Sequence, residues 1–453
     1  MAYLGRPGAT APLTSADIPD NSITGAKIVA GTIEASDVAA DMATQAELDT
    51  VSTVASAALP KAGGAMTGAI TTNSTFDGTD IAVRDALHAP KASPTFTGTA
   101  TFSGDIVPST PLSHRNHLIN GDMQVAQRGT SYEGAAGRPN DDDSPILDRW
   151  YLKTEGDNIV DVTQSTEAPT NQLYSVGLDV ETVNKKFGIA QIIESKNCVG
   201  LYGNAVTLSF KAKVSTLSGN YPLDNVKCAI IEWRSTADAV TSELVSAWGA
   251  EGTNPTLATN LHYLNTPANL NVTTSWATYS VTATGSSGSG CNNFAVFIWS
   301  DVSDTTLGDF LYITDCQLEQ GSNATPFERR GYGDELTRCQ RYCIAIKTPG
   351  TTGGIQVGQG QLYNTTFMQG PMMLPAAMRV PPVIVSTGDG TMQAYSGGAG
   401  DSCGPVIVDG PGQLKDTTTI SFSISNLSIG SAGQAVVFRT NGDSSYIYLE
   451  SEL

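Results

Sequence analysis

One aliphatic residue recurs every five positions near the N-terminus, and this spacing limits what that part of the chain can form. The series is Leu13, Ile18, Ile23, Ile28, Ile33, Val38, Ala43 and Leu48. A period of five fits neither the helical repeat of about 3.6 residues nor the strand repeat of about 2. One apolar side chain in five is too few to build a core within one chain. We therefore expect the series from Ile18 to Val38 to be buried against sister chains at a trimer axis, or against a docking partner. An unstructured tether with coincidental spacing is the alternative.

A short helix is predicted directly after this series. Thr44 and Glu47 have the spacing of a capping box, in which each side chain satisfies one free backbone donor. The apolar residues that follow are three or four positions apart: Leu48, Val51, Ala55 and Ala58. This is the pattern of a coiled-coil seam, and Pro60 must end it. Because so short a helix is marginal alone, we expect three copies to meet along Leu48 and Val51.

Two related stretches then occur thirty residues apart. Residues 60–68 read Pro-Lys-Ala-Gly-Gly-Ala-Met-Thr-Gly, and residues 90–98 read Pro-Lys-Ala-Ser-Pro-Thr-Phe-Thr-Gly. In these copies the chain resembles bacteriophage tail fibre proteins, whose stalks carry this unit. The resemblance implies an elongated homotrimer. Its N-terminus would be fixed to phage tail, baseplate or adaptor proteins, and its C-terminal end would face the bacterial surface.

The sequence changes character at residue 116. Residues 116–129 and 148–151 are similar to the start of a jelly-roll, carbohydrate-binding-like module common in phage fibres. Strand-like runs follow at residues 205–212, 226–233, 275–282, 293–300 and 310–318. A closing motif at residues 317–329, Gln-Leu-Glu-Gln-Gly-Ser-Asn-Ala-Thr-Pro-Phe-Glu-Arg, is the most specific resemblance in the chain. We expect residues 116–330 to form one β-sandwich.

The last of these runs predicts a half-buried strand. Its alternate residues are expected to share one face. They are Phe310, Tyr312, Thr314, Cys316 and Leu318.

All five tryptophans lie in the predicted sandwich. A sugar site pairs an apolar ring face with polar groups that fix the orientation of the ligand. Trp233 and Trp299 belong to apolar strands and are predicted to pack in the core. Trp248 and Trp276 lie in loop-like sequence and are predicted to contact glycan. Core packing is the alternative for both.

One acidic run is a candidate metal site. Asp141, Asp142 and Asp143 could supply oxygen ligands to a structural calcium ion. The alternative is a solvated turn. No other cofactor is expected.

Residues 331–453 are predicted to form a small C-terminal β head. A helix is expected at residues 334–343, and this stretch and the terminal residues 446–453 are typical of phage fibre C-terminal domains. The Gly-rich stretch at residues 388–404 reads as a surface loop, the usual place for binding residues. Tyr395 in this loop is the third predicted glycan contact, with packing inside its own loop as the alternative.

Composition excludes several partners. The net charge of −19 and pI near 4.5 argue against a nucleic-acid partner, which would require clustered Lys and Arg. No apolar run approaches the length of about 18 residues that a membrane span needs, so no membrane insertion is expected. The first residues lack the apolar core of a secretion signal. The seven cysteines, an odd number widely spaced, indicate no disulfide framework.

These patterns predict a mainly β protein, and the resemblance to phage tail fibre proteins implies an elongated homotrimeric fibre with a short coiled-coil and β stalk. Its segments would be 1–43 for virion attachment, 44–59 for the helix, 60–115 for the stalk, 116–330 for the jelly-roll sandwich and 331–453 for the receptor-facing head. The expected function is virion attachment by multivalent binding of bacterial surface polysaccharide through the distal β domains. Such a protein is made in the bacterial cytoplasm and located in the virion tail.

Two other functions stay open. The sequence contains no Walker, His-Glu-x-x-His or Gly-x-Ser-x-Gly motif, so no enzyme is expected. A tailspike-type polysaccharide depolymerase is nevertheless an alternative, because two carboxylates suffice for glycoside hydrolysis and leave no local motif. A purely structural fibre or spacer is the other.

Overall fold

The computed structural model describes most of the C-terminal three quarters of the chain and parts of the N-terminal quarter. The described residues are 14–32, 37, 45–57, 113–134, 138–215, 223, 225–286, 290–347, 356–386, 392–396, 399–402, 406–407, 416–425, 427–440 and 446–453. The chain divides into two compact units, residues 1–105 and 106–453. Within the described ranges, no helix is both long and apolar enough to cross a membrane.

A ten-residue backbone repeat underlies the similarity seen in the N-terminal sequence. Two short 3-10 helices, η1 (Ser15–Asp17) and η2 (Gly25–Lys27), begin ten residues apart. Each follows an extended threonine. Asn21 and Gly31, also ten residues apart, both have positive φ angles, of 61° and 86°. Asn and Gly adopt this conformation more readily than other residues do, so the two sequence copies share one backbone course.

The aliphatic series of this unit is exposed in the single chain. Ile18, Ile23 and Ile28 have 39%, 56% and 38% of their surface accessible. Ile33 and Val38 lie outside the described residues. Burial of the series against other chains therefore stays a prediction.

The predicted short helix is confirmed as α1 (Gln45–Ala57). Leu48 and Val51 are exposed by 53% and 67%, so neither side chain is buried in the single chain. Thr44 and both copies of the Pro-Lys-Ala unit lie outside the described residues. The trimer axis and the stalk stay predictions.

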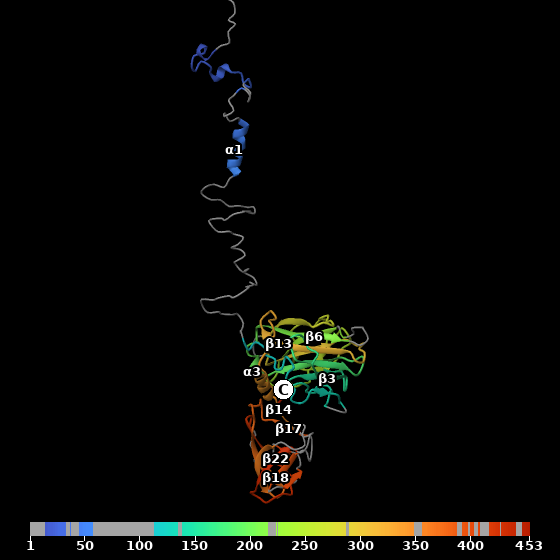
Figure 1. Cartoon of the computed structure of the whole chain (residues 1–453). Coiled ribbons are helices and arrows are strands. Elements are labelled where there is room, and N and C mark those ends of the chain that lie inside the picture. The colour runs from blue at the N-terminus through green and yellow to red at the C-terminus, as the bar shows by residue number, and fades with distance from the viewer. Residues whose placement is uncertain are drawn as a thin grey trace, which may run out of the picture. The chain divides into compact units, whose positions relative to one another are not determined.

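The prediction of a mainly β protein is confirmed in residues 106–453. Two antiparallel sheets form a sandwich, with β3, β6 and β13 labelled in Figure 1. One sheet has the order β1 (Ser131–Tyr132), β3 (Val160–Ser165), β4 (Ser175–Val180), β13 (Phe310–Gln320), β6 (Ala205–Ser215) and β11 (Ala277–Thr284). The other has the order β10 (Leu261–Tyr263), β7 (Val226–Trp233), β12 (Asn293–Ser300), β5 (Phe187–Ile193) and β2 (Tyr151–Thr154). The five predicted strands are β6, β7, β11, β12 and β13.

The main core lies between these sheets. Alternate residues of β6, among them Leu208 and Phe210, pack against Phe294 and Ile298 of β12, and all four are fully buried. Opposite sheets thus bury alternate side chains, as expected for a sandwich. Trp150 is also buried in this core. Trp299 is buried as predicted, in a separate cluster, whereas Trp233, which was also predicted to pack in the core, is half-exposed at the end of β7.

The outer face of the five-stranded sheet is covered as well. A second apolar cluster joins Phe297 and Trp299 of β12 to Leu244, to Tyr342 and to Leu453. The covering elements include the hairpin of β8 (Val245–Ala247) and β9 (Thr256–Leu257) and the helix α4 (Tyr332–Gln340). As a result β5 and β12 are buried along their whole lengths. The outer face of the six-stranded sheet, in contrast, is exposed along β11 at Thr278, Ser280 and Thr282.

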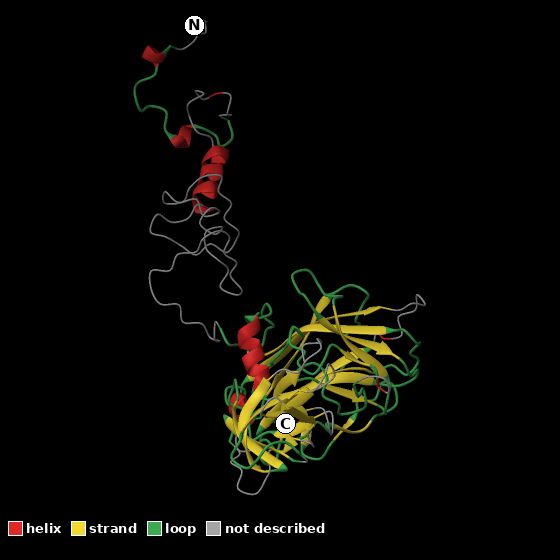
Figure 2. Cartoon of the chain, turned by 60° about the horizontal axis from the view of Figure 1, so that its bottom comes forward, coloured by secondary structure: helices red, strands yellow, loops and turns green. Residues whose placement is uncertain are grey.

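The C-terminal part forms two further antiparallel sheets, drawn in orange and red in Figure 1. The larger has the order β19 (Ala399–Ser402), β18 (Met392–Ser396), β22 (Ala435–Thr440), β15 (Gln356–Asn364), β16 (Phe367–Met373), β21 (Thr419–Ile424) and β20 (Val406–Ile407). The smaller has the order β14 (Cys343–Lys347), β23 (Tyr446–Glu450) and β17 (Val383–Ser386). Strands dominate residues 113–453, with α4 and the single turn α3 (Ser195–Cys198) as helices (Figure 2). The predicted helix at residues 334–343 ends early, at Gln340, because Cys343 already pairs with Glu450 in a strand.

Buried ion pairs join the C-terminal residues to the sandwich. Glu452 accepts hydrogen bonds from both Arg128, at 3.1 Å, and Arg149. The side chains of these arginines are 4% and 1% exposed. Arg341 and Glu194 form another pair, at 2.6 Å. These contacts fix the C-terminal sheets to the sandwich.

Six cysteines lie in the described part of the chain, and all six are free and buried. Burial raises the pKa of the Cys198 and Cys228 thiols to about 12.

Candidate functional site

A bulge in β13 decides which of its side chains reach the outer face of the six-stranded sheet. The pairing of β13 with β6 shifts between Thr314 and Gln317, and Asp315 has a positive φ of 54°. A bulge adds a residue to one strand and so reverses the alternation of its side chains. The core residues accordingly change from odd to even numbers: Leu311, Ile313, Cys316 and Leu318.

This bulge overturns the prediction that five alternate residues of the strand share one face. Cys316 and Leu318 are fully buried between the sheets. Phe310 and Tyr312 precede the bulge and lie on the outer face, where both are half-buried. The prediction was wrong because it assumed a regular strand.

Three aromatic side chains adjoin one another on this outer face, and we call Phe310, Tyr312 and Trp276 the aromatic row. The rings of Phe310 and Tyr312 are nearly parallel, with centroids 5.3 Å apart. Trp276, just before β11, is tilted by 54° with its centroid 6.4 Å from that of Tyr312. Gly177 on the neighbouring β4 leaves room for the central ring, since a Cβ there would lie 3.2 Å from Tyr312 Cε1. The row presents one half-exposed apolar surface.

An ion pair lies beside the row. Lys213 Nζ is 5.6 Å from the centroid of Tyr312 and 6.0 Å from that of Trp276. The same ammonium group is 2.9 Å from Glu167 Oε1, and its hydrogen bond lowers the pKa of Glu167. The indole N–H of Trp276 donates to this oxygen at 3.4 Å. The Lys213–Glu167 pair thus places a donor and an acceptor at one end of the apolar surface.

A carboxyl group marks the other end. Asp179 on β4 is the register partner of Phe310. Partial burial, together with the nearby carboxylates of Glu181, Asp161 and Asp309, raises the pKa of Asp179 to about 6. Its Oδ1 is buried and makes no hydrogen bond within the described part of the chain. The other end of the row thus carries a partly buried carboxyl group, one oxygen of which is left unpaired by the described residues.

We expect Asp179 to make stability depend on pH. In the unfolded chain an aspartate ionises near pH 4, whereas in the folded protein Asp179 ionises near pH 6. The folded state therefore holds this proton more tightly, and its contribution to stability is lost as pH rises from 4 through 6. Asp179→Asn should remove this loss, so the variant should gain stability relative to the unsubstituted protein between pH 4 and pH 7. Urea denaturation at both pH values measures the gain.

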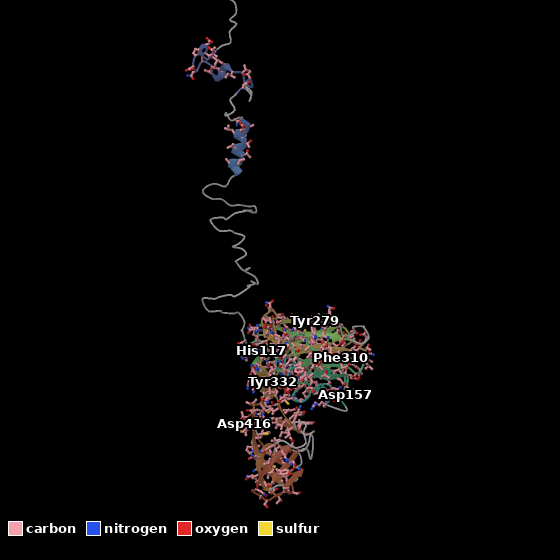
Figure 3. All side chains as sticks on the ribbon, in the orientation of Figure 1. His117, Asp157, Tyr279, Phe310, Tyr332 and Asp416 are labelled. Carbon is pink, nitrogen blue, oxygen red and sulfur yellow. The ribbon has the colours of Figure 1, made fainter. Side chains whose placement is uncertain are left out.

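Asp157→Asn is the matched control, because this carboxylate is exposed on the same sandwich (Figure 3). Its stability is measured at the same two pH values. An Asp179→Asn variant that behaves like this control would contradict the prediction.

The structure places Trp248 away from the aromatic row. Its ring packs edge-on against Phe297 with centroids 5.8 Å apart, and its N–H donates to the Thr154 carbonyl at 3.0 Å. Both contacts join Trp248 to the five-stranded sheet, as part of the layer that covers its outer face. Trp248 therefore packs this cover, and its predicted glycan contact gains no support from the geometry.

Tyr395 lies in a different sheet, on β18 of the C-terminal part. The guanidinium carbon of Arg439 is 3.9 Å from its ring centroid, and Arg439 is held by Gln393. One face of Tyr395 is thus covered by the protein. The structure does not bring it together with Trp276.

The acidic run predicted to hold calcium faces a lysine. Lys153, whose side chain is fully buried, pairs with Asp142 at 3.1 Å and also with Asp143. In the part of the chain that the structure describes, no group of three or more His, Cys, Asp or Glu side chains could hold a metal ion. The ammonium group of Lys153 supplies the positive charge that these carboxylates require, and no cage of ligands supports the calcium prediction.

Comparisons with known proteins give structural likeness only. No protein-family model and no curated protein matches the sequence. Solved structures do match. The enzymatically active domain of tailspike protein 4 from bacteriophage CBA120 is 17% identical, over 46% of this chain and 21% of that one, with a TM-score of 0.26. The CBM22-1 xylan-binding domain of Paenibacillus barcinonensis Xyn10C is 12% identical, over 41% and 94%, with a TM-score of 0.25. TmCBM61, solved with β-1,4-galactotriose, is 15% identical, over 46% and 99%, with a TM-score of 0.23.

The chain therefore resembles carbohydrate-binding β-sandwich modules and a phage tailspike domain in part of its length. It spans about a fifth of the tailspike structure that it matches. Identities and TM-scores of this size assign no function, so the functional argument rests on the aromatic row.

Proposed function

We propose that this protein is a phage tail fibre adhesin that binds bacterial surface polysaccharide at the aromatic row. The observation that carries the proposal is a half-exposed row of three aromatic rings on an outer sheet face, with an ion pair at one end and an unpartnered carboxylate oxygen at the other. A sugar ring has an apolar face that stacks on aromatic rings and hydroxyl groups that need polar partners. Lys213 can donate to such hydroxyls, and Glu167 and Asp179 can accept from them.

Single sites of this open kind bind weakly, so attachment depends on several sites acting together. A millimolar site is worth only about −4 kcal/mol, and tethering copies raises the effective concentration for the second and third contacts. The exposed aliphatic residues of the N-terminal unit, Ile18, Ile23 and Ile28, and the exposed seam of α1 support assembly into a trimer. The C-terminal sheets, fixed to the sandwich through Glu452, would face the host together with it.

Glycan cleavage is a second candidate function, and Asp179 is the observation that favours it. A glycosidase acid needs a raised pKa beside a second carboxylate. The pKa of Asp179 is raised, and Asp161 lies opposite it in register on β3. We retain the adhesin as the proposed function, because the aromatic row can bind glycan whether Asp179 acts as a hydrogen-bond acceptor or as a catalytic acid.

Sizing chromatography of the full-length protein with purified bacterial O-polysaccharides and capsules distinguishes these functions. We expect protein to elute with full-length glycan from at least one strain, as an adhesin requires. Shortened glycan would instead show a depolymerase. If the Asp179→Asn variant left the glycan at full length, Asp179 would be identified as the catalytic acid. Separate elution with every glycan of a broad panel would contradict both functions and favour a spacer.

A further inference from the structure

A pocket of about 390 Å³ opens at the edge of the five-stranded sheet, whereas the aromatic row lies on the six-stranded sheet. Trp233, the last residue of β7, forms one wall, and Val240 and Leu261 add apolar surface beside it. Ligand pockets typically range from about 300 to 1,000 Å³. This volume therefore suits one or two sugar-sized rings and is too small for a long chain.

The walls of the pocket are held in place by hydrogen bonds. Ser246 Oγ donates to the Thr256 carbonyl at 3.1 Å, which ties β8 to β9 beside the pocket. The turn between these strands is not part of the pocket lining, but it is held by Asp301, which is fully buried. Its Oδ2 accepts from Gly252 N at 2.9 Å and pairs with Lys227 at 2.6 Å. A wall fixed in this way is formed before a ligand arrives, which reduces the entropy lost on binding.

Trp233 offers the face of its ring rather than its N–H group. The indole nitrogen already donates to the Thr236 carbonyl at 2.7 Å, so the ring orientation is set within the protein. The side chain remains half-exposed. A fixed indole face is a surface on which the apolar face of a sugar stacks.

Four exposed polar residues line the pocket together with this ring. Throughout the described ranges, no hydrogen bond or ion pair to another protein group is made by the side chains of four exposed lining residues: Thr241, Glu243, Thr259 and Asn260. Together they supply hydroxyl, carboxylate and amide groups. Glu243 is the charged member of the lining, so a ligand that carries a carboxylate would be repelled.

We propose that this pocket is a second carbohydrate site, which takes a neutral sugar unit such as a chain end or branch. The indole of Trp233 stacks on the sugar, and Glu243 accepts hydrogen bonds from its hydroxyls. The site is built from the other sheet of the sandwich and shares no residue with the aromatic row. It can therefore exist whether or not the row binds glycan.

Fluorine NMR of the full-length protein, labelled with 5-fluorotryptophan, tests both sites at once. The chain has five tryptophans, so five resonances are expected. Trp233→Phe and Trp276→Phe assign the two that matter. The probes are D-glucose, D-galactose, D-mannose and N-acetyl-D-glucosamine, with D-glucuronate as the charged comparison. We expect at least one neutral sugar to shift the Trp233 resonance saturably, and glucuronate to bind at least tenfold more weakly.

Glu243→Ala should weaken this binding about tenfold or more, because it removes a charged hydrogen-bond partner. Asp304→Ala is the matched control, an exposed carboxylate of the same sandwich outside the pocket. It should leave the titration unchanged. A Trp233 shift that persists undiminished in Glu243→Ala would overturn the proposal.

The Trp233 and Trp276 resonances distinguish failure of the second carbohydrate site from failure of the proposed function. If the polysaccharides of the sizing experiment shift Trp276 while no neutral sugar shifts Trp233, the second site is overturned and the adhesin stands. If a neutral sugar shifts Trp233 while the polysaccharides leave Trp276 unmoved, the second site is supported and the aromatic row loses its role.

Discussion

Tyr312→Ala should raise the dissociation constant for the bound glycan by tenfold to a hundredfold. Tyr312 is the central ring of the aromatic row and contacts both Phe310 and Trp276. Its removal opens a gap in the stacking surface and leaves Lys213 without one of its two neighbouring rings. Central, partly desolvated aromatic residues typically contribute about 2 kcal/mol or more to an interface. Titration of the polysaccharide identified by sizing chromatography measures the change.

The fold should survive this substitution, because Tyr312 lies on the outer face and is only half-buried. Tyr332→Ala is the matched control. This tyrosine is 55% exposed at the start of α4 and is well separated from Phe310 in Figure 3. Its removal should leave affinity unchanged. Equal affinity in both variants would exclude the row as the binding site.

Glu452→Ala should lower the free energy of unfolding by about 3–5 kcal/mol, the usual result of breaking a buried ion pair. The substitution leaves Arg128 and Arg149 buried without their shared carboxylate. Burial opposes ionisation of Glu452, but Arg149 and Arg128 outweigh it and hold its pKa below the usual value. Tryptophan fluorescence during urea denaturation reports this change, because every tryptophan lies in residues 106–453.

Asp334→Ala provides the contrast for this experiment. Asp334 pairs with Arg338 on the exposed surface of α4, at 3.4 Å. Such a surface pair contributes about 0.5 kcal/mol or less. If the two substitutions destabilise the protein equally, Glu452 does not fix the C-terminal sheets as described.

The strands could be predicted from sequence where burial is continuous. The bounds of β7 and β12 coincide with the expected runs, because apolar residues form most of each strand and both strands end at polar turns. The cover over the five-stranded sheet could not be predicted. It depends on contacts between β12 and residues as distant as Tyr342 and Leu453, and no local pattern encodes such pairings. Trp248 joins this cover from the loop after β8, and its predicted glycan contact stays a prediction.

The candidate site was only partly predictable. Trp276 was identified because it lies outside a regular apolar run. Its partners Phe310 and Tyr312 were predicted to share a face with Cys316 and Leu318, because one alternation was assumed through β13. A signal was present, since the aliphatic residues Leu311 and Ile313 and then Leu318 change from odd to even positions within one strand. Such a change of parity indicates a bulge. The stalk and the trimer axis remain predictions, because they depend on contacts between chains.

The buried cysteine thiols can report where and how often the folded protein opens. A thiol reacts as its thiolate and only when reagent can reach it, and all six described cysteines are buried, with Cys198 and Cys228 held at a raised pKa. Oxidation or alkylation of each cysteine is therefore limited by how often its surroundings open. Cys198 and Cys228 report on the space between the sheets, whereas Cys339 reports on the covering layer. Labelling followed by peptide mapping would show which layer opens first as the protein ages in solution.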